Sequence, residues 1–330
     1  MRALALFSGG LDSMLAIKLI TEQGIDVTAL HINIGFGSKE DRSALLRKRA
    51  QMVGADFEIV DTREQFISEI LFNPRYGYGK NFNPCIDCHG NMFRIARALL
   101  PQYDARFIIT GEVLGQRPMS QRADAIRNVT RLAGDEEGGL ILRPMSAKLM
   151  APTIPEKEGW VDRERLLGIE GRGRETQLAL AKRYGFEEYE SPGGGCLLTE
   201  AAFAQKIRDV VDHDGTFRVE DIDLLKVGRH LRLPEGAKLI IGKNQAENER
   251  IAKLRHPEYR LAKALDISGP LSLITKGASE ADRTLAARLI LTYTKTPADT
   301  PAKVRIGEEI LEAKPFETKE AVRPYFVVRA

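Results

Sequence analysis

The stretch of sequence that decides the fold is Arg2-Ala3-Leu4-Ala5-Leu6-Phe7-Ser8-Gly9-Gly10-Leu11-Asp12-Ser13. Residues 2–7 form a short apolar run typical of a buried strand, and residues 14–20 place apolar side chains at helical spacing. The two glycines between these segments indicate a tight loop. We therefore expect a strand, a loop and a helix, with free backbone N–H groups at the helix N-terminus, where an anion binds well.

The same alternation continues along the first half of the chain. The apolar patterns predict helices at residues 42–53 and 91–100, and further strands at residues 26–32, 57–60 and 106–109. Strands that alternate with helices are typical of a doubly wound parallel sheet in an α/β domain. Ligands bind such sheets at the carboxyl ends of the strands, so the turn Thr110-Gly111 belongs to a candidate site.

Beyond residue 145 the pattern changes, and the chain divides into three predicted parts. Prolines break the middle part into short pieces, with a strand at 140–142 before it and helices at 175–184 and 200–211. The last part has short strands at 238–241 and 271–274 and a helix at 281–293, which indicates a smaller α+β domain. We expect a first domain over residues 1–145, a connecting region over 146–224 that completes the active site, and a separate domain over 225–330.

Composition excludes several classes of protein. The chain has 330 residues, of which 43% are hydrophobic and 29% charged, which excludes a disordered or collagen-like chain. Its apolar runs fall far short of the roughly 20 residues of a membrane helix, and no signal-peptide pattern is present, so we expect a cytoplasmic protein. The net charge is only +3, but residues 225–330 carry 20 basic and 13 acidic residues. A solvated surface and a nucleic-acid contact both explain that excess.

The three cysteines, Cys85, Cys88 and Cys196, form one C-x-x-C pair and one distant residue. This number and spacing favour metal binding or thiol chemistry over structural disulfides. Cys85 and Cys88 precede an apolar helical stretch, and a helix N-terminus lowers the pKa of a thiol. Cys196 ends the glycine-rich segment Ser191-Pro192-Gly193-Gly194-Gly195. Unligated cysteines are the plainer alternative.

The loop after the first strand is neither a Walker A loop nor a G-x-G-x-x-G dinucleotide fingerprint. Ser8-Gly9-Gly10-Leu11-Asp12-Ser13 instead resembles the PP-loop, S-G-G-x-D-S, of N-type ATP pyrophosphatases. The resemblance implies that ATP is split between its α and β phosphates. It implies hydrogen bonds to pyrophosphate from Ser8, Gly9, Gly10 and Ser13, and a role for Asp12 at Mg²⁺. The adenosine is then expected near His31 and Ile32 and near Thr110 and Gly111.

Three further segments resemble tRNA-thiolating enzymes. Asn83-Pro84-Cys85-Ile86-Asp87-Cys88 is similar to the N-P-x-x-x-C-N stretch of tRNA 2-thiouridylases, and residues 192–199 around Cys196 are similar to a glycine-rich cysteine segment of the same group. Residues 111–116, Gly-Glu-Val-Leu-Gly-Gln, followed by Ser120-Gln121, resemble a segment of tRNA 4-thiouridine synthetases, which adds Gln116 to the nucleotide site. These resemblances together cover about the first 200 residues.

Two chemistries use such cysteines. In the first, one cysteine carries sulfur as a persulfide and a second resolves the resulting disulfide. In the second, Cys85, Cys88 and Cys196 hold a 4Fe-4S cluster whose fourth iron binds the sulfide that attacks the activated base. The cluster uses all three cysteines, and we favour it. A zinc site with His89 as fourth ligand is a further alternative, although adjacent Cys88 and His89 rarely bind one tetrahedral metal together.

The C-terminal part resembles the RNA-binding module of NFACT proteins. The resemblance rests on Ile240-Ile241-Gly242-Lys243-Asn244-Gln245-Ala246-Glu247-Asn248 and on Ser268-Gly269-Pro270-Leu271, with departures at Lys243 and Leu271. It makes Lys243, Asn244 and Asn248 candidate RNA contacts. In the first domain Arg117 and Arg122 are further candidates, with Arg127, Arg131, Arg172 and Arg174 beside them, because arginine suits phosphate backbones. Ordinary turn residues and salt-bridged surface arginines are the plainer interpretations.

Taken together, these patterns predict an ATP-dependent tRNA sulfurtransferase that adenylates a uridine oxygen and replaces it with sulfur. Cys85, Cys88, Cys196 and Asp12 would be the catalytic residues. The expected cofactors are ATP, Mg²⁺ and a 4Fe-4S cluster, and the expected partners are tRNA and a sulfur donor, either sulfide or a persulfide carrier, with a homodimer left open and no membrane. Two alternatives remain: an amide- or nitrile-forming ligase with structural zinc, and a non-catalytic RNA-binding adaptor. The sequence leaves open whether C2 or C4 of uridine is thiolated.

Overall fold

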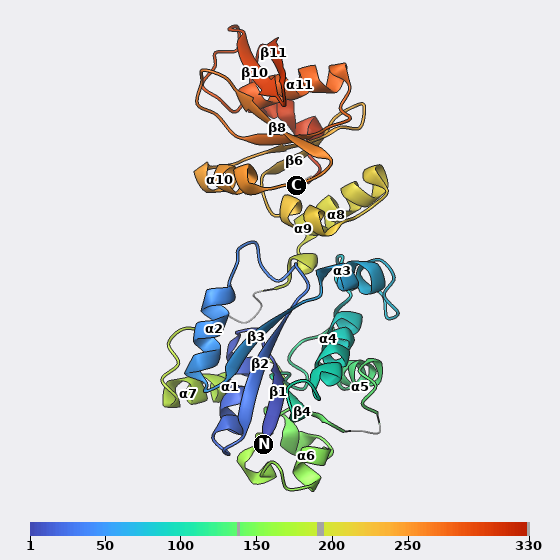
Figure 1. Cartoon of the computed structure of the whole chain (residues 1–330), viewed down its shortest axis with the longest axis vertical. Helices are drawn as coiled ribbons and strands as arrows, with labels where there is room; N and C mark the ends of the chain where they lie inside the picture. The colour runs from blue at the N-terminus through green and yellow to red at the C-terminus, as the bar shows by residue number, and fades with distance from the viewer. Residues whose placement is uncertain (137–138, 190–194, 329–330) are drawn as a thin grey trace. The chain divides into compact units, whose positions relative to one another are not determined.

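The computed structural model describes residues 1–136, 139–189 and 195–328. Contacts divide it into two compact units, Met1–Thr199 and Glu200–Ala330, coloured blue to yellow-green and yellow to red (Figure 1). The boundary expected near residue 225 therefore differs from the contact boundary, which falls after Thr199. Of the glycine-rich loop expected before Cys196, residues 191–194 lie outside the described residues.

The first unit is built on a five-stranded parallel sheet, which confirms the predicted α/β class. The strands lie in the order β3-β2-β1-β4-β5, and every pairing is parallel. Their bounds are β1 (Arg2–Leu6), β2 (Asp26–Asn33), β3 (Asp56–Asp61), β4 (Ala105–Thr110) and β5 (Ile141–Leu142). The chain leaves the central strand β1 and returns on both sides of it, so the carboxyl ends of β1, β2 and β4 meet at one edge.

Helices cover both faces of this sheet (Figure 1). Apolar residues of α1, α2 and α7 join those of β1 in one continuous core, while α4 and α5 pack together over the other face. The helices are α1 (Leu11–Thr21), α2 (Ser43–Met52), α4 (Cys85–Leu99), α5 (Ala123–Leu132) and α7 (Glu175–Arg183), with the short α3 (Arg63–Gln65) and α6 (Ile154–Lys157). Among the described residues no helix has the length and apolar character that crossing a membrane requires.

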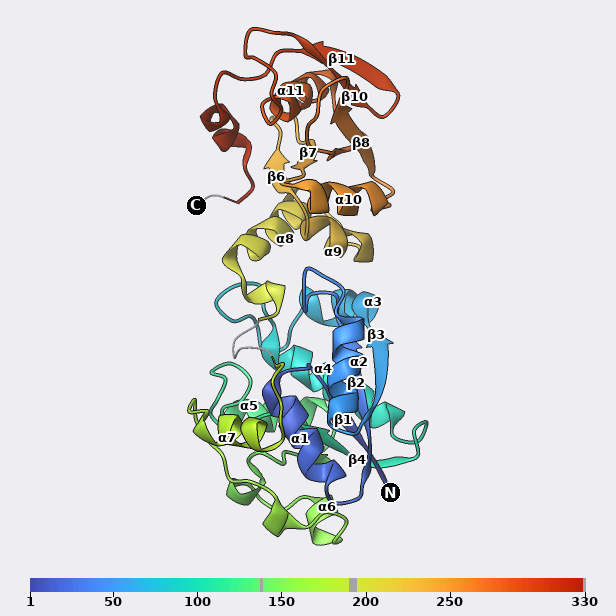
Figure 2. The same cartoon turned by 90° about the vertical axis from the view of Figure 1, so that its left-hand side faces the viewer.

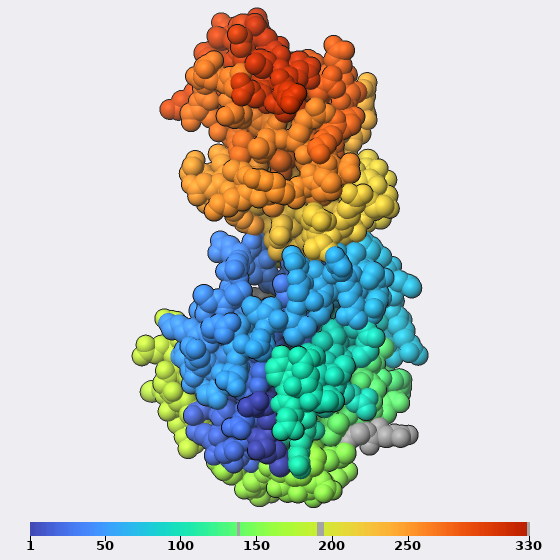
Figure 3. Space-filling view, viewed as in Figure 1, coloured from blue at the N-terminus to red at the C-terminus, as the bar shows by residue number. Residues whose placement is uncertain are grey.

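Helix α4 begins six residues earlier than its apolar spacing predicts. The first turns carry cysteines, Asp87 and Gly90, so the apolar repeat starts only at Met92. Gly90 is needed because an added Cβ would lie 2.4 Å from Cβ of Leu132 on α5. This close approach fixes the start of α4 against its neighbour. In the space-filling view the teal segment of α4 lies beside the dark-blue start of the chain (Figure 3).

The second unit contains a six-stranded antiparallel sheet, as expected of an α+β domain. Its strand order is β11-β10-β8-β9-β7-β6. The strands are β6 (Arg229–Arg232), β7 (Lys238–Ile241), β8 (Tyr259–Ala264), β9 (Ser272–Thr275), β10 (Ala302–Ile306) and β11 (Glu309–Ala313). One face packs on α11 (Glu280–Leu291), and part of the other packs on α9 (Val219–Leu225) and α10 (Gln245–Lys253).

A buried ion cluster joins α8 (Ala201–Asp214) to this sheet. Asp209 Oδ2 lies 2.8 Å from Nζ of Lys238, whose side chain is fully buried, and 2.8 Å from Nη2 of Arg232. Burial opposes ionisation of Asp209, but the hydrogen bond from Arg232 and the charge of Lys238 together lower its pKa. Because each cation needs this carboxylate, α8 is held to β6 and β7 by charge as well as by apolar packing.

Replacing Asp209 by Asn should destabilise the second unit. The variant leaves the charge of Lys238 buried without a counter-ion, a change that costs about 3–5 kcal/mol. We expect the amides of β6 and β7 to exchange hydrogen at markedly lower urea concentrations. Asp214→Asn is the matched control, since Asp214 bonds the same Arg232 but is more exposed. Equal exchange in the two variants would contradict this account of the cluster.

Candidate functional site

The loop between β1 and α1 has the geometry of an anion site. Helix α1 begins at Leu11 with Gly10 as its N-cap, so no side chain at the cap occupies the N–H groups of the first turn. Ser13 Oγ donates to the carbonyl oxygen of Gly10 (2.8 Å) and lies 3.4 Å from Oγ of Ser8. Both hydroxyls therefore lie at the N-terminal turn of α1, where a phosphate-binding loop needs them.

Arg49 of α2 is hydrogen-bonded to the loop between β1 and α1. Its Nη1 donates to the carbonyl oxygen of Gly9 at 2.9 Å, and the residue is almost fully buried. Gly9 has a φ of +76°, and an added Cβ would lie 2.4 Å from Cδ2 of Leu46, so glycine is required. Burial, helped by the charge of Arg42, lowers the pKa of Arg49. Arg49 was not among the predicted site residues, because only the folded structure shows that its side chain reaches the loop.

Asp12 is bonded to residues that lie far from it in sequence. Gln116 Nε2 donates to Asp12 Oδ2 at 2.7 Å, and the buried Gln177 of α7 donates to Gln116 Oε1 at 3.2 Å. Arg174, one residue before α7, has Nη2 3.9 Å from Asp12 Oδ1. The structure thus brings the predicted residues Asp12, Gln116 and Arg174 together. Gln177 was not predicted, although a polar residue on the buried face of a helix is the signal that could have found it.

Gly111, directly after β4, packs against the phosphate loop. A Cβ added there would lie 2.4 Å from the backbone nitrogen of Ser13 and 2.6 Å from the carbonyl carbon of Asp12. The end of β4 therefore lies directly against the phosphate loop, and only glycine allows this approach. Thr110 is buried, and its Oγ1 accepts from the N–H of Glu112 at 3.3 Å.

His31 and Ile32 lie near the carboxyl end of β2, next to the end of β1. The Nδ1 atom of His31 is 3.1 Å from the carbonyl oxygen of Phe7, and burial, more than the charge of Arg42, lowers the pKa of its imidazole. Ile32 is buried. The residues expected to form the nucleotide site therefore share one edge of the sheet, while their contact with adenosine stays a prediction.

Backbone hydrogen bonds bring the Cys196 segment to the start of α4. Leu197 N–H donates to the carbonyl oxygen of Phe36 (2.8 Å), and Phe82 N–H donates to that of Leu198 (3.2 Å). The amide of Asn81 also donates to the carbonyl oxygen of Thr199 at 2.7 Å. Leu198 and Thr199 are thus bonded to the segment that leads into Cys85, while Leu197 is bonded to the segment after β2.

The three cysteines lie within electrostatic reach of one another, but they differ in exposure. Cys88 is buried, and burial first, then the charges of Cys196, Cys85 and Asp87, raise the pKa of its thiol well above the ordinary value. The expected lowering by the helix N-terminus is therefore wrong for Cys88, because burial dominates. Cys85 and Cys196 are half-exposed, and Cys85 Sγ accepts from the amide of Asn83 at 3.2 Å. Within residues 1–136, 139–189 and 195–328, no three His, Cys, Asp or Glu side chains are arranged to hold a metal ion.

The buried carboxylate of Glu112 connects α4, the helix that contains Cys85 and Cys88, with the end of β4 beside the phosphate loop. Glu112 Oε1 lies 3.0 Å from Nδ1 of His89, which follows Cys88, and Oε2 accepts from Nε of Arg143 at 2.9 Å. Burial opposes ionisation of Glu112, but the charge of Arg143 and the bonds to His89 lower its pKa below the ordinary range. Since Glu112 follows Gly111, residues 111 and 112 contact the phosphate loop and the cysteine helix respectively.

The predicted RNA contacts mostly have structural partners. Arg117 is exposed, whereas Arg122 pairs with Asp124 at 2.8 Å at the start of α5. In the second unit Asn244 caps α10 by accepting from the N–H of Glu247, and Asn248 Oδ1 accepts from the N–H of Leu271 at 3.0 Å. Lys243 is exposed and lies 4.0 Å from Glu247. The two asparagines therefore hold the turn in shape, and RNA contact by any of these residues stays a prediction.

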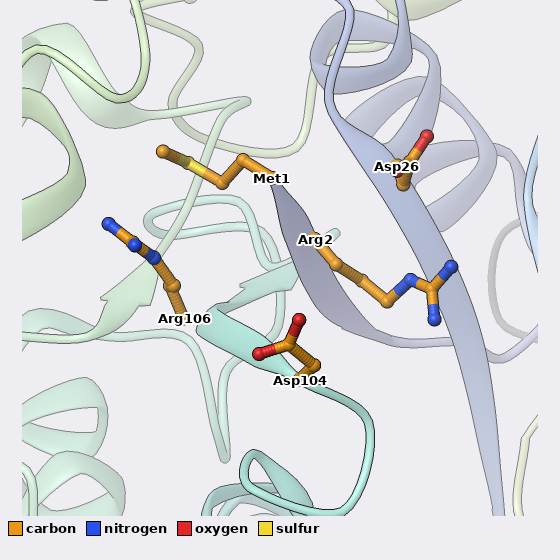
Figure 4. Close-up of a pocket in the computed structure, with 5 residues that line it drawn as sticks. All are labelled: Met1, Arg2, Asp26, Asp104 and Arg106. Carbon is orange, nitrogen blue, oxygen red and sulfur yellow. The ribbon is translucent and has the colours of Figure 1, made fainter.

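A polar pocket lies at the opposite edge of the parallel sheet. Figure 4 shows it at the amino ends of β1, β2 and β4, where the side chains of Met1, Arg2, Asp26, Asp104 and Arg106 surround it. Ligands of parallel sheets bind at the carboxyl ends of strands, where Ser8, Gly111 and the cysteine helix lie. This pocket is therefore separate from the candidate site.

Two family models match parts of this chain. Residues 2–76 match the "Arginosuccinate synthase N-terminal HUP domain", and residues 228–326 match the "NFACT protein RNA binding domain". The first match covers the phosphate loop and β1 to β3, and the second covers almost all of the antiparallel sheet. The first unit is therefore an α/β domain whose first 76 residues are similar to a HUP domain, and the resemblance of the second unit to the NFACT module is confirmed.

Individual relatives show a more specific resemblance than the family models do. A stretch of 127 residues is 32% identical to the tRNA-specific 2-thiouridylase of Frankia alni and covers 34% of this chain and 36% of that protein. A stretch of 89 residues is 36% identical to the enzyme of the same name from Desulfosudis oleivorans and covers 26% and 25% of the two chains. A 4-thiouridine synthetase solved with RNA and ATP has 18% identity and a TM-score of 0.39, over 68% of this chain and 52% of that one. The chain thus spans about a third or less of the two relatives' lengths.

Replacing Glu112 by Gln should destabilise the first unit. The variant leaves Arg143 buried without its carboxylate, which costs about 3–5 kcal/mol, so thermal unfolding at pH 7 should begin at a clearly lower temperature. Because the folded pKa of Glu112 is lowered, its stabilisation is present above about pH 4.3, the ordinary glutamate pKa, and is lost as pH falls from there through the folded value.

The matched control is Glu69→Gln, which breaks the half-exposed pair of Glu69 with Arg94. It should change stability by at most about 1 kcal/mol. The difference in unfolding temperature between the two variants should disappear in acid, because Glu112 is then protonated even where it has not been replaced. A gap that stays constant from pH 7 to pH 3 would contradict the assignment of the charge to Glu112.

Proposed function

We propose that the chain is an ATP-dependent tRNA sulfurtransferase that replaces a uridine oxygen by sulfur in the cytoplasm. The observation that carries the proposal is the double contact of residues 111 and 112. Gly111 lies against the phosphate loop, and Glu112 binds the histidine next to Cys88. An adenylating site and a thiol site on one short segment suit a reaction in which sulfur attacks an adenylated base. The similarity to tRNA-specific 2-thiouridylases supports the choice of tRNA.

The first step is adenylation. The uridine carbonyl oxygen attacks the α-phosphorus of ATP, the bond to the β-phosphate oxygen breaks, and pyrophosphate leaves. Backbone N–H groups and the hydroxyls of Ser8 and Ser13 would hold the pyrophosphate, with the charge of Arg174 nearby. Mg²⁺, when bound, neutralises phosphate charge. Asp12 would offer it Oδ1, which accepts no hydrogen bond from the residues that the structure describes, while Gln116 fixes Oδ2.

The second step delivers sulfur, and we write it through thiols. The thiolate of Cys196 takes the outer sulfur of a persulfide carrier, which leaves as a thiol. The terminal sulfur of the resulting Cys196 persulfide attacks the adenylated carbon, and AMP leaves with the former carbonyl oxygen. A second thiolate then attacks the sulfur of Cys196, which forms a protein disulfide and releases the thiocarbonyl. A dithiol reductant returns the disulfide to two thiols with two electrons. Cys85 is the better resolving residue, because it is half-exposed, whereas Cys88 is buried, and its sulfur accepts an amide hydrogen bond.

Asp12→Ala should abolish adenylation without unfolding the protein. Loss of the carboxylate removes the proposed Mg²⁺ ligand, and we expect AMP formation with ATP, tRNA and a persulfide donor to fall by about a hundredfold or more. Asp124→Ala removes a carboxylate from an exposed pair in the same unit and should keep full activity. Full activity in Asp12→Ala would contradict the catalytic assignment and favour an RNA-binding adaptor.

The route of sulfur can be measured with serine variants of the three cysteines, purified without oxygen. The persulfide route predicts that Cys85→Ser and Cys196→Ser abolish tRNA thiolation, while the buried Cys88→Ser keeps part of it. Iron and sulfide are analysed on the same samples. About four irons per chain in the wild type, lost in all three variants, would replace the persulfide by the 4Fe-4S cluster. Stoichiometric zinc without tRNA-dependent AMP release would favour the ligase.

A further inference from the structure

A basic strip lies on the face of the antiparallel sheet opposite α11. Exposed and buried residues alternate along β10 and over residues 261–263 of β8, as they do in a half-buried strand. Ala262, Val304 and Ile306 point into the core with α11. Lys263, Lys303 and Arg305 therefore occupy the opposite face, and all three are exposed. Figure 2 shows β8, β10 and β11 side by side.

The strand register sets two of these cations against each other. Arg305 lies directly opposite Lys263 across β10 and β8, while Lys303 faces Glu312 across β10 and β11. Like charges at directly opposed positions destabilise a sheet, whereas opposite charges stabilise it. No residue in the part of the chain that the structure describes forms an ion pair with Lys263 or Arg305. The sheet thus keeps a repulsive pair that a single acidic residue would relieve.

Two exposed aliphatic side chains border the repulsive pair. Leu261, two residues before Lys263 on β8, is 42% exposed, and Ile310, opposite Arg305 on β11, is 51% exposed. The result is a flat surface of cations with a small apolar part, bordered by one carboxylate. Such a surface suits a polyanion with a partly apolar backbone more than an apolar protein face.

We propose that this strip, Lys263, Lys303 and Arg305 with Leu261 and Ile310, contacts the phosphate and ribose backbone of RNA. The inference rests on the proposed function, since it takes tRNA as the ligand. Charge complementarity supports this proposal. RNA phosphates between Lys263 and Arg305 would supply the negative charge that no acidic side chain of the described residues provides there. The proposed contact does not involve the turn at Lys243, where the side chains of Asn244 and Asn248 accept hydrogen bonds from backbone N–H groups.

The test compares two double variants of the full chain. Lys263→Gln with Arg305→Gln removes the repulsive pair, and Lys295→Gln with Lys314→Gln removes two exposed cations outside the sheet. Binding of unmodified tRNA is measured by fluorescence anisotropy over a range of salt. We expect the strip variant to bind at least about tenfold more weakly, with a salt slope lower by about 1–2, and the control variant to bind like the wild type.

Thermal unfolding separates this role from a structural one. Removal of Arg305 or Lys263 relieves repulsion, so the midpoint should stay the same or rise, whereas a structural role would lower it. Wild-type binding that both variants retain equally would overturn the strip while leaving the proposed function intact. A wild type that binds no tRNA would overturn both. Unchanged tRNA binding with lost affinity for poly-aspartate would assign the strip to an acidic protein instead.

Discussion

The close approach of β4 to the phosphate loop is the constraint on which the first unit depends. A side chain at residue 111 would overlap the backbone of Asp12 and Ser13, so glycine sets the distance between the nucleotide edge and β4. The next residue, Glu112, is carried into a buried position between Arg143 and His89. The distance between the phosphate loop and α4 is therefore set by backbone packing and by the charged triad of Glu112, Arg143 and His89.

A second kind of constraint acts at the cysteines. Cys88 and Cys196 are 108 residues apart in sequence, and a main-chain hydrogen bond from Phe82 N–H to the carbonyl oxygen of Leu198 joins their segments. Because this bond uses backbone atoms, the local sequence has wide freedom while the geometry stays fixed. Burial then distinguishes the three thiols: Cys88 is kept neutral, and the two half-exposed sulfurs remain available for reaction.

Much of the fold could be predicted because the first 110 residues alternate between strand and helix patterns around glycine turns. The start of α4 could not, since Cys85 and Gly90 interrupt the apolar repeat and only packing against Leu132 explains them. Among site residues, Asp12 and Gln116 were predicted and do meet. Arg49 and Gln177 were missed because a buried polar residue in a helix looks like a surface residue until its partners are known. In the last part β8 and β10 were missed, since alternating lysine, arginine and alanine give a weak strand signal.

The cluster around Asp209 has a consequence for how such a module can be inherited. Helix α8 supplies the only carboxylate within 3 Å of Lys238 among the described ion pairs, although it precedes the segment that matches the NFACT family model. A gene fusion that took only residues 228–326 would carry a buried lysine into its new host without the counter-charge. A stable version of this module therefore needs α8 as well as the segment that matches the family model.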